Sequence, residues 1–373
     1  VVRETRLLTE LRERIRDACR VPEPDAVAPL VEEAALAPAA LTATQALAAR
    51  LAQGVRSNRT RAGGVDALML EFSLDSREGI ALMCVAEALL RIPDAATRDR
   101  LIRDKIGQGD WRAHVGRSPS LFVNAAAWGL FITGTLVDTH STSTLEAAFA
   151  SLLRKGGEPL IRAGVDVAMR LLGRQFVLGR TIEEALANAA ERAARGYRFS
   201  FDMLGEAALT TADAQRYEAA YAHAIDVIGN AARGAGPFAG PGISIKLSAL
   251  HPRYVRAQRE RVHAELLPRL VALCAAAKAH DIGLNIDAEE ADRLELSLDL
   301  FAALAAEPSL AGWEGLGFVV QAYQKRSRAV IAWLVALARM HRRRLMVRLV
   351  KGAYWDAEIK RAQVDGLPDY PVF

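Results

Sequence analysis

The chain has 373 residues, of which 51% are hydrophobic and 25% are charged, and its formal net charge is +4. These values are ordinary for a soluble globular protein of two or three domains and argue against an intrinsically disordered chain. The basic excess is small for a nucleic-acid-binding protein. We therefore expect no nucleic-acid partner, and a scaffold or DNA-binding regulator is a weaker alternative to an enzyme.

The three cysteines, Cys19, Cys84 and Cys274, lie far apart, without the spacing of a metal site or a disulfide framework. This pattern fits a reducing compartment, and we expect a cytoplasmic protein that holds no metal. The charged start of the chain is unlike a secretory signal. Residues 121–137 are apolar but only just long enough to span a membrane, so a buried helix is the preferred interpretation.

The first half of the chain shows helical patterns. Apolar residues recur with helical spacing over 7–19, a proline cluster at 22–29 is expected to break that helix, and a second helix is predicted from about Thr42 to Gln53, ending at Gly54. The polar stretch 56–64 is the best linker candidate, and helical patterns dominate 65–177. We predict an N-terminal helical arm over 1–56 and an α-helical domain over 57–177.

Near Gly196 short apolar segments begin to alternate with longer helical ones. Strands are predicted over 197–204, 242–248, 282–288, 316–322 and 345–350, and helices over 212–230, 261–280, 292–306 and 327–340. The consecutive arginines Arg342, Arg343 and Arg344 are expected at a helix end, where cations are favourable. Strand–helix alternation of this kind predicts parallel strands joined by crossover helices.

Polar side chains stand at or just after the carboxyl end of every predicted strand. They are Asp202 and Glu206, Lys246 and Ser248, Asp287 with Glu289 and Glu290, Gln321 and Tyr323, and Arg348 and Lys351. An open sheet gathers its ligand at one switch point, whereas a barrel brings all its strand ends to one mouth, so this pattern favours a barrel. Eight strands typically take about 250 residues, but only 178 run from Gly196 to Phe373. We therefore predict an α/β fold in which 178–373 form an incomplete (β/α)8 TIM-type barrel of about five strands.

Single charges at these positions have ordinary structural explanations, since Asp287 could cap the next helix and Lys246 could extend into solvent. Yet Lys246, Asp287 and Arg348 each lie within an apolar run, where an unpaired charge is costly to bury. A mouth that pairs these cations and anions could also bind a zwitterion. The glycines at 234, 236, 240 and 242 precede a strand, so they predict a loop rather than a dinucleotide-binding turn, and neither a P-loop nor a nucleophile elbow is present.

The strand ends resemble those of one known family. The segments 201–208 (FDMLGEAA), 244–254 (SIKLSALHPRY), 285–290 (NIDAEE), 320–323 (VQAY) and 347–356 (VRLVKGAYWD) resemble successive strands of the proline dehydrogenase family. The likeness is strongest to its bacterial bifunctional members, whose arm and helical domain the upstream region also resembles. The ribbon–helix–helix DNA-binding domain that some members carry is not visible in this sequence.

This resemblance implies a distorted (β/α)8 barrel that holds FAD noncovalently and oxidises L-proline to Δ1-pyrroline-5-carboxylate. Hydride passes from ring C5 of proline to flavin N5 and electrons then pass to a membrane quinone, while the protein supplies orientation and electrostatics. Because the sequence shows no convincing membrane span, any contact of this cytoplasmic enzyme with the inner membrane is expected to be peripheral. A homo-oligomer and an aldehyde dehydrogenase domain beyond this chain are further expectations.

The resemblance gives cofactor roles to several residues. Arg348 is expected beside the flavin ring near N5, where its charge stabilises the reduced flavin, and Gln321 is expected to contact the same ring. The residues expected to line the cofactor are Val350, Lys351, Gly352 and Ala353. Among these, the glycine permits a close approach of the backbone.

Other residues match the substrate pocket of the family. Lys246 and Asp287 correspond to its charged network, Tyr354 to a wall against the proline ring, and Asp202 and Glu206 to supporting positions. The paired arginines that clamp the substrate carboxylate in the family lie beyond Phe373, as do the strands that hold the adenosine end of FAD. We therefore expect residues 1–373 alone to be inactive.

The main alternative enzyme is a Schiff-base aldolase on the same barrel, with Lys246 or Lys351 as its nucleophile. That chemistry needs a lysine whose pKa is lowered. A metal-dependent carboxylate site is weaker still, because no histidine accompanies Asp287 and Glu289.

Overall fold

The computed structural model describes residues 2–58 and 177–373. The chain divides into two compact units, one formed by Val1–Ala35 with Thr181–Phe373 and the other by Leu36–Arg180. In the second unit the described residues form mainly the helix α3 (Pro38–Asn58). The helices predicted within 65–177, including the apolar run 121–137, lie outside the described residues. The predicted domain limits at 56 and 177 stay predictions.

The N-terminal helices begin and end differently from the prediction. Helix α1 (Val2–Asp17) confirms the helix predicted over 7–19 and is followed by a short 3-10 turn, η1 (Ala18–Arg20). The proline cluster does separate α1 from α2 (Glu23–Ala34), but Pro24 then lies in the first turn of α2, where a missing N–H is harmless, and Pro29 lies inside that helix. The predicted stop at Gly54 is wrong, because α3 continues to Asn58. One glycine among alanines costs a helix only about 1 kcal/mol.

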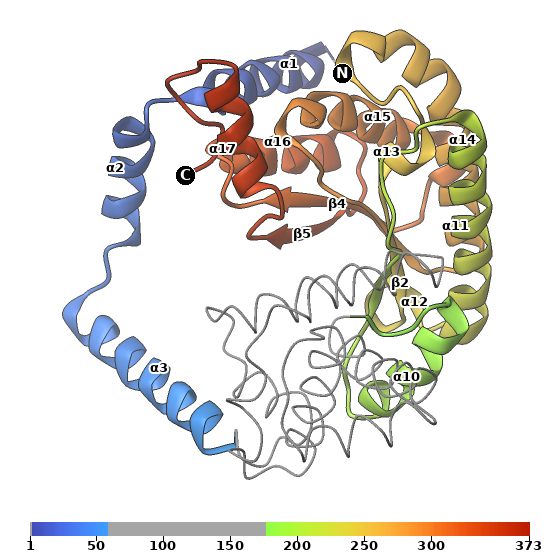
Figure 1. The fold of residues 1–373 in the computed structure, drawn as a ribbon, viewed down its shortest axis with the longest axis horizontal. Coiled ribbons are helices and arrows are strands. Elements are labelled where there is room, and N and C mark those ends of the chain that lie inside the picture. Colours follow the sequence, from blue (N-terminus) through green and yellow to red (C-terminus); the bar gives the residue numbers. More distant parts are fainter. Residues whose placement is uncertain (1, 59–176) are drawn as a thin grey trace, which may run out of the picture. The chain divides into compact units, whose positions relative to one another are not determined.

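Strands and helices alternate along the rest of the first unit (Figure 1). The strands are β1 (Ser200–Asp202), β2 (Gly242–Ile245), β3 (Gly283–Ile286), β4 (Leu316–Gln321) and β5 (Met346–Val350). The long helices between them are α11 (Thr211–Ala232), α14 (Arg259–Ala279), α15 (Leu294–Ala306) and α16 (Ser327–Met340). These elements confirm the predicted strands and helices, with limits that shift by a few residues.

Two longer helices that were not predicted, α10 and α17, and several short elements complete the described part. They are α10 (Ile182–Ala194), α12 (Gly236–Ala239), α13 (Leu247–Leu250), η3 (Arg256–Gln258), η4 (Ala291–Arg293), η5 (Pro308–Leu310) and α17 (Trp355–Val364). The glycine-rich stretch before β2 holds the single turn α12 rather than a dinucleotide-binding turn. Helix α11 begins with a capping box, in which Thr210 and Asp213 accept from each other's backbone N–H groups.

The five strands form one parallel sheet in the order β1-β2-β3-β4-β5. Figure 1 shows that this sheet is curled and that α11, α14, α15 and α16 lie along its outside. Strands β2, β3 and β4 are buried along their whole length, whereas Val347 and Leu349 of β5 are 46% and 58% exposed. The architecture is that of a (β/α)8 barrel represented by five strands in the described residues, which confirms the predicted fold class.

The arginine run lies at a helix end, as predicted. Helix α16 ends at Met340, and Arg342 then takes a left-handed conformation with φ of 48°. The guanidinium of Arg343 donates to the carbonyl oxygens of Leu304, Ala305, Leu310 and Trp313. This side chain therefore ties the segment before β5 to the last turn of α15 and to the loop that precedes β4.

Helix α1 packs against α16 of the barrel. Its Leu11 and Ile15 are buried, and the Arg12 guanidinium lies 5.4 Å from the centre of the Trp333 ring. Arg12 also forms ion pairs with Glu295 and Asp299 of α15, at 3.1 Å and 2.6 Å. Burial lowers the pKa of Arg12, and the two carboxylates oppose that effect. Helix α1 is therefore held to the helical layer by both apolar and charged contacts.

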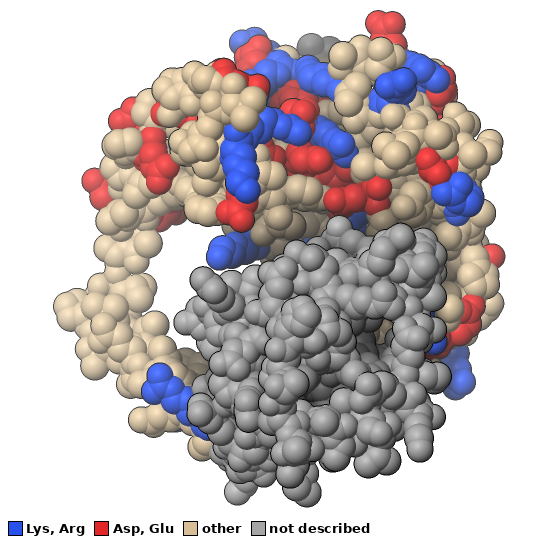
Figure 2. All heavy atoms as spheres, in the orientation of Figure 1, with Lys and Arg blue, Asp and Glu red and all other residues tan. Residues whose placement is uncertain are grey.

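On the face of the molecule seen in Figure 2, basic and acidic side chains of the described residues are interspersed. No single described helix is long and apolar enough to cross a membrane, and α2 and α3 reach that length and composition only when they are joined.

Candidate active site

The parallel register brings polar side chains of neighbouring strands into lateral rows. Asp202 of β1 is paired with Ser244, and Ser244 with Asn285 of β3. Val319 of β4 is paired with Arg348. Lys246 and Asp287 directly follow the paired ends of β2 and β3. The alternation of side chains along a strand therefore places Lys246, Asp287 and Arg348 on one face of the sheet.

Lys246, Asp287 and Arg348 form one ion-pair cluster. Lys246 Nζ donates to Asp287 Oδ2 at 3.0 Å and to Asp202 Oδ1 at 2.7 Å. Arg348 Nη2 donates to Asp287 Oδ1, and Arg348 Nη1 donates to Ser244 Oγ at 2.8 Å. The Asp287 side chain is only 7% exposed, and each of its two oxygens is paired with a different cation, which offsets the cost of burying the charge. The prediction that these charges are paired is confirmed.

The cluster keeps Lys246 protonated. Burial by itself lowers the pKa of Lys246, but the hydrogen bonds and charges of Asp202 and Asp287 outweigh burial and raise it. For Asp287, burial and the charge of Asp202 raise the pKa, while the two cations oppose them. Lys246 therefore does not have the lowered pKa that a Schiff-base nucleophile needs.

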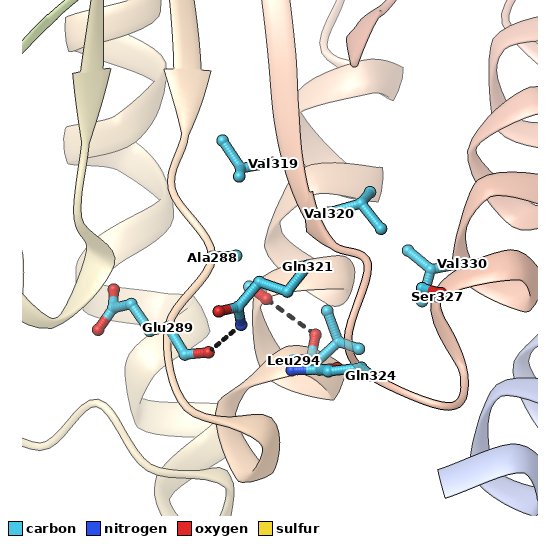
Figure 3. Close-up of a pocket in the computed structure, with 10 residues that line it drawn as sticks. Ala288, Glu289, Leu294, Val319, Val320, Gln321, Gln324, Ser327 and Val330 are labelled. Atoms are coloured by element: carbon cyan, nitrogen blue, oxygen red, sulfur yellow. Dashed lines mark hydrogen bonds between the residues drawn. The ribbon is translucent and has the colours of Figure 1, made fainter. Parts of the chain in front are cut away.

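The Gln321 side chain lies at the end of β4 and connects two loops. Its Nε2 donates to the Glu289 carbonyl oxygen at 2.8 Å, which Figure 3 draws as a dashed line. Its Oε1 accepts from the Tyr323 hydroxyl at 2.9 Å and from Ala353 N at 3.2 Å. Gln321 is 4% exposed. It therefore holds the loop after β3 and the loop after β5 at fixed positions.

Tyr354 lies in the loop after β5 and reaches toward β1. Its hydroxyl donates to Glu206 Oε2 at 3.1 Å, and its backbone N donates to the Tyr323 hydroxyl at 2.9 Å. Burial and the charge of Glu206 raise the pKa of Tyr354, so the phenol stays protonated and acts as a donor. The hydrogen bond between Tyr354 and Glu206 thus connects the loops that follow the two edge strands, β5 and β1.

Glu289 is turned into the protein. Its Oε1 accepts from Ser248 N at 3.0 Å, and its Oε2 is paired with Arg293 at 2.7 Å. Burial raises the pKa of Glu289, and the contacts with Ser248 and Arg293 oppose that effect. This carboxylate serves as a bridge between the ends of β2 and β3.

The enclosed cavity in Figure 3 is too small for a substrate. It measures about 10 Å³ and lies between the end of β4 and the helices α15 and α16, with Gln321, Val320 and Leu294 among its lining residues. Such a volume holds at most one water molecule. The cluster of Lys246, Asp287 and Arg348, rather than this cavity, is the candidate site.

The remaining residues predicted to line the cofactor lie on the same loop. Gly352 has φ of +130°, and a Cβ atom there would lie 1.6 Å from Cε1 of Tyr323. Lys351 is exposed and is not one of the residues of the ion-pair cluster described above. Its carbonyl oxygen accepts from Tyr323 N at 3.1 Å. The Val350 carbonyl oxygen accepts from Ala322 N at 2.7 Å. In the described residues, no group of three metal-ligating side chains occurs.

Two residues that support the cluster, Ser244 and Tyr221, are not predicted from the sequence as site residues. Ser244 accepts from Arg348, and its position two residues before Lys246 on the same strand could have indicated it. The Tyr221 hydroxyl accepts from Lys246 N at 3.2 Å, and burial raises the pKa of this tyrosine to about 12. Tyr221 lies in α11, and no sequence signal connects it to Lys246.

Comparison with known families matches almost the whole chain. Residues 185–373 match the family described as proline dehydrogenase, and residues 9–56 match the N-terminal domain of the proline utilization A proline dehydrogenase. Residues 64–176 match a family described as the DNA-binding domain of proline dehydrogenase. That description runs against our expectation of no nucleic-acid partner. The matched residues lie outside those that the structure describes, so the expectation stays a prediction.

Individual relatives agree with the family matches. The bifunctional protein PutA of Salmonella typhimurium is 61% identical over 365 residues, which are 97% of this chain and 28% of that protein. Proline dehydrogenase 1 of Bacillus subtilis is 28% identical over 185 residues, which are 50% of this chain and 53% of that protein. A crystal structure of a mutant of proline utilization A from Bradyrhizobium japonicum, 47% identical, superposes with a TM-score of 0.66 over 95% of this chain and 35% of that one.

This chain spans about three tenths of the length of the PutA proteins it matches. The proline dehydrogenase match covers more than half of the chain, and it contains all five strands and the ion-pair cluster. The chain therefore belongs to the proline dehydrogenase family.

Proposed function

We propose that the natural protein oxidises L-proline to Δ1-pyrroline-5-carboxylate at these strand ends, with FAD as electron acceptor. The observation that carries the proposal is the cluster in which Lys246 and Arg348 share Asp287. Proline is a zwitterion with one charge of each sign. Counted with Asp202, which is paired with Lys246, the cluster has two cations and two carboxylates, so it can meet both signs without leaving a net buried charge.

The residues present fit a flavin. Arg348 Nε is buried and meets no acceptor within the described part of the chain, so it can donate to a ligand atom beside the cluster. The Gln321 amide nitrogen has two N–H groups, of which the Glu289 carbonyl takes one. A bound flavin supplies the two-electron acceptor that the oxidation of proline requires. The family to which the chain belongs supports this cofactor.

The chain's own residues have separate tasks in this proposal. The Arg348 cation favours the negative charge that develops on a reduced flavin ring. Lys246 and Asp287 orient the substrate, and Tyr354 forms a wall against its ring. Gln321 and the backbone of 350–353 hold the cofactor. The clamp on the substrate carboxylate is expected from residues that follow Phe373.

Other proposals concern the whole protein. The matched relatives are described as bifunctional, which supports an aldehyde dehydrogenase domain beyond this chain. The arm at 1–56, the helical domain at 57–177 and the barrel from 178 onward would form its amino-terminal part. Transfer of electrons to a quinone fits a cytoplasmic protein in peripheral contact with the inner membrane. A homo-oligomer is a further proposal for the whole protein.

The experiment is an absorption spectrum of the protein purified from the full-length gene, taken before and after anaerobic addition of L-proline. Flavin bands that bleach with L-proline, and not with buffer, would support the proposal. Treatment with borohydride and a carbonyl substrate tests the aldolase alternative. Because the pKa of Lys246 is raised, no adduct is expected at this lysine at neutral pH. A colourless protein that takes up no FAD and forms an adduct would overturn the dehydrogenase.

A further inference from the structure

Hydrogen bonds join the ends of all five strands into a closed circuit, which we call the strand-end ring. Ala207 N donates to Ser248 Oγ at 3.0 Å, and Ser248 N donates to Glu289 Oε1 at 3.0 Å. The circuit continues from Glu289 through Gln321 and Tyr323 to Tyr354, and the Tyr354 hydroxyl returns it to Glu206. Its side chains are Glu206, Ser248, Glu289, Gln321, Tyr323 and Tyr354.

Tyr323 helps to hold the Gln321 amide in one orientation. The Tyr323 hydroxyl has a single hydrogen, which it donates to Gln321 Oε1, while Tyr354 N donates to the same hydroxyl. If the Gln321 amide were flipped, its NH2 group would face the Ala353 N–H donor and its oxygen would face the Glu289 carbonyl oxygen. The flipped amide would lose both of these contacts, so the observed orientation is favoured, and in it Gln321 Oε1 also accepts from the Tyr323 hydroxyl.

Tyr323 also contacts the loop at 351–354 through both its backbone and its side chain. Its backbone N donates to the Lys351 carbonyl oxygen, its ring occupies the space where a Cβ of Gly352 would lie, and its hydroxyl accepts from Tyr354 N. The side chain is 8% exposed. Because one tyrosine contacts the loop at Lys351, Gly352 and Tyr354, the loop cannot shift without breaking these contacts.

We propose that Tyr323 is a positioning residue that holds Gln321 and the 351–354 loop in the geometry needed by the flavin and by proline. This inference rests on the proposed function, because Gln321 and Tyr354 are its proposed cofactor and substrate contacts. Reacting groups must be held to within a fraction of an ångström by neighbours that are themselves locked in place. Tyr323 supplies that lock for both residues.

The alternative is that Tyr323 only fills space. Tyr323→Phe separates the two cases, because it keeps the ring under Gly352 and removes only the hydroxyl. It leaves Tyr354 N as a donor without an acceptor and takes one of the two donors from Gln321 Oε1. The matched control is Tyr370→Phe, which removes an exposed hydroxyl that accepts only from Gln363 Nε2, at 3.3 Å, among the described residues.

The first readout is amide hydrogen exchange in the protein from the full-length gene, which requires no activity. We expect exchange at Ala353 and Tyr354 to become about tenfold faster in Tyr323→Phe, in line with the loss of one buried hydrogen bond, and to stay unchanged in Tyr370→Phe. Exchange in the buried core of α14, around Leu270 and Cys274, should stay unchanged in both variants.

The second readout is the kinetics of flavin-loaded enzyme. We expect Tyr323→Phe to retain flavin and to raise KM for L-proline by about tenfold, while Tyr370→Phe matches the wild type. Unchanged exchange at 353–354, an unchanged KM, or faster exchange that includes α14 would each overturn the positioning role. If the wild type neither binds flavin nor oxidises proline, the proposed function fails, and the exchange data still decide whether Tyr323 holds the loop.

Discussion

The two faces of the sheet are stabilised by different physics. The inner face carries Lys246, Asp287 and Arg348 near the carboxyl ends of the strands, where each charge requires a partner at a definite distance. The alternate residues of β2, β3 and β4 face the helices and are apolar and buried, as for Ile243, Ile245, Leu284, Ile286 and Phe318. Phe318, for example, packs against Phe301 of α15 with ring centres 5.0 Å apart.

This contrast teaches where the sequence is free to change. Apolar burial is non-directional, so the outer face tolerates residues of similar size and shape. A buried ion pair tolerates little, because removal of one partner leaves an uncompensated charge. Changes to the inner face should therefore affect chemistry and stability together, whereas changes to the outer face should affect stability alone.

The largest effect is expected from Asp287→Ala. This substitution leaves Lys246 without its most buried partner and Arg348 without its only carboxylate among the contacts of the described residues. We expect the free energy of unfolding of the barrel to fall by about 3–5 kcal/mol and proline oxidation to be lost. Denaturant unfolding and steady-state kinetics measure the two quantities.

The matched control for this loss is Asp292→Ala. Asp292 is paired with Arg361 at 2.9 Å, but the two side chains are 64% and 46% exposed. An exposed pair of this kind contributes little, so stability should change by less than about 0.5 kcal/mol. Equal losses in the two aspartate variants would contradict the special status of the inner face.

An effect on stability alone is expected from Ile245→Ala on the outer face. Ile245 is fully buried, and its truncation should cost about 2–5 kcal/mol of unfolding free energy. The folded fraction should retain the KM for proline of the wild type. Val335→Ala, at a position in α16 that is 43% exposed, is the control. A KM that rises with Ile245→Ala alone would show that the two faces are not independent.

The order and type of the barrel elements could be predicted, because alternating short apolar and long amphipathic segments leave few other arrangements. The shared location of Lys246, Asp287 and Arg348 also followed from strand-end positions and from the cost of burying unpaired charge. Their pairing is confirmed, while their roles with cofactor and substrate stay proposals.

Other features depend on contacts between distant residues and leave no local signal. The hydrogen bond from Lys246 N to the Tyr221 hydroxyl joins residues 25 positions apart, and the one from the Tyr354 hydroxyl to Glu206 joins residues 148 positions apart. Helix ends were also misjudged. Gly54 and Pro29 are each unfavourable inside a helix, yet the surrounding residues carry the helix past them.

The central claim is that the inner-face cluster is where proline is oxidised, and Arg348→Lys tests it most directly. Lysine keeps the positive charge but cannot donate to Ser244 and Asp287 through one planar fork. The measurement is the rate of flavin bleaching after anaerobic mixing of L-proline with flavin-loaded protein from the full-length gene. We predict a rate about 10- to 100-fold below that of the wild type, because the substitution removes one or two charged hydrogen bonds. A wild-type rate in a variant that retains its flavin would contradict the claim.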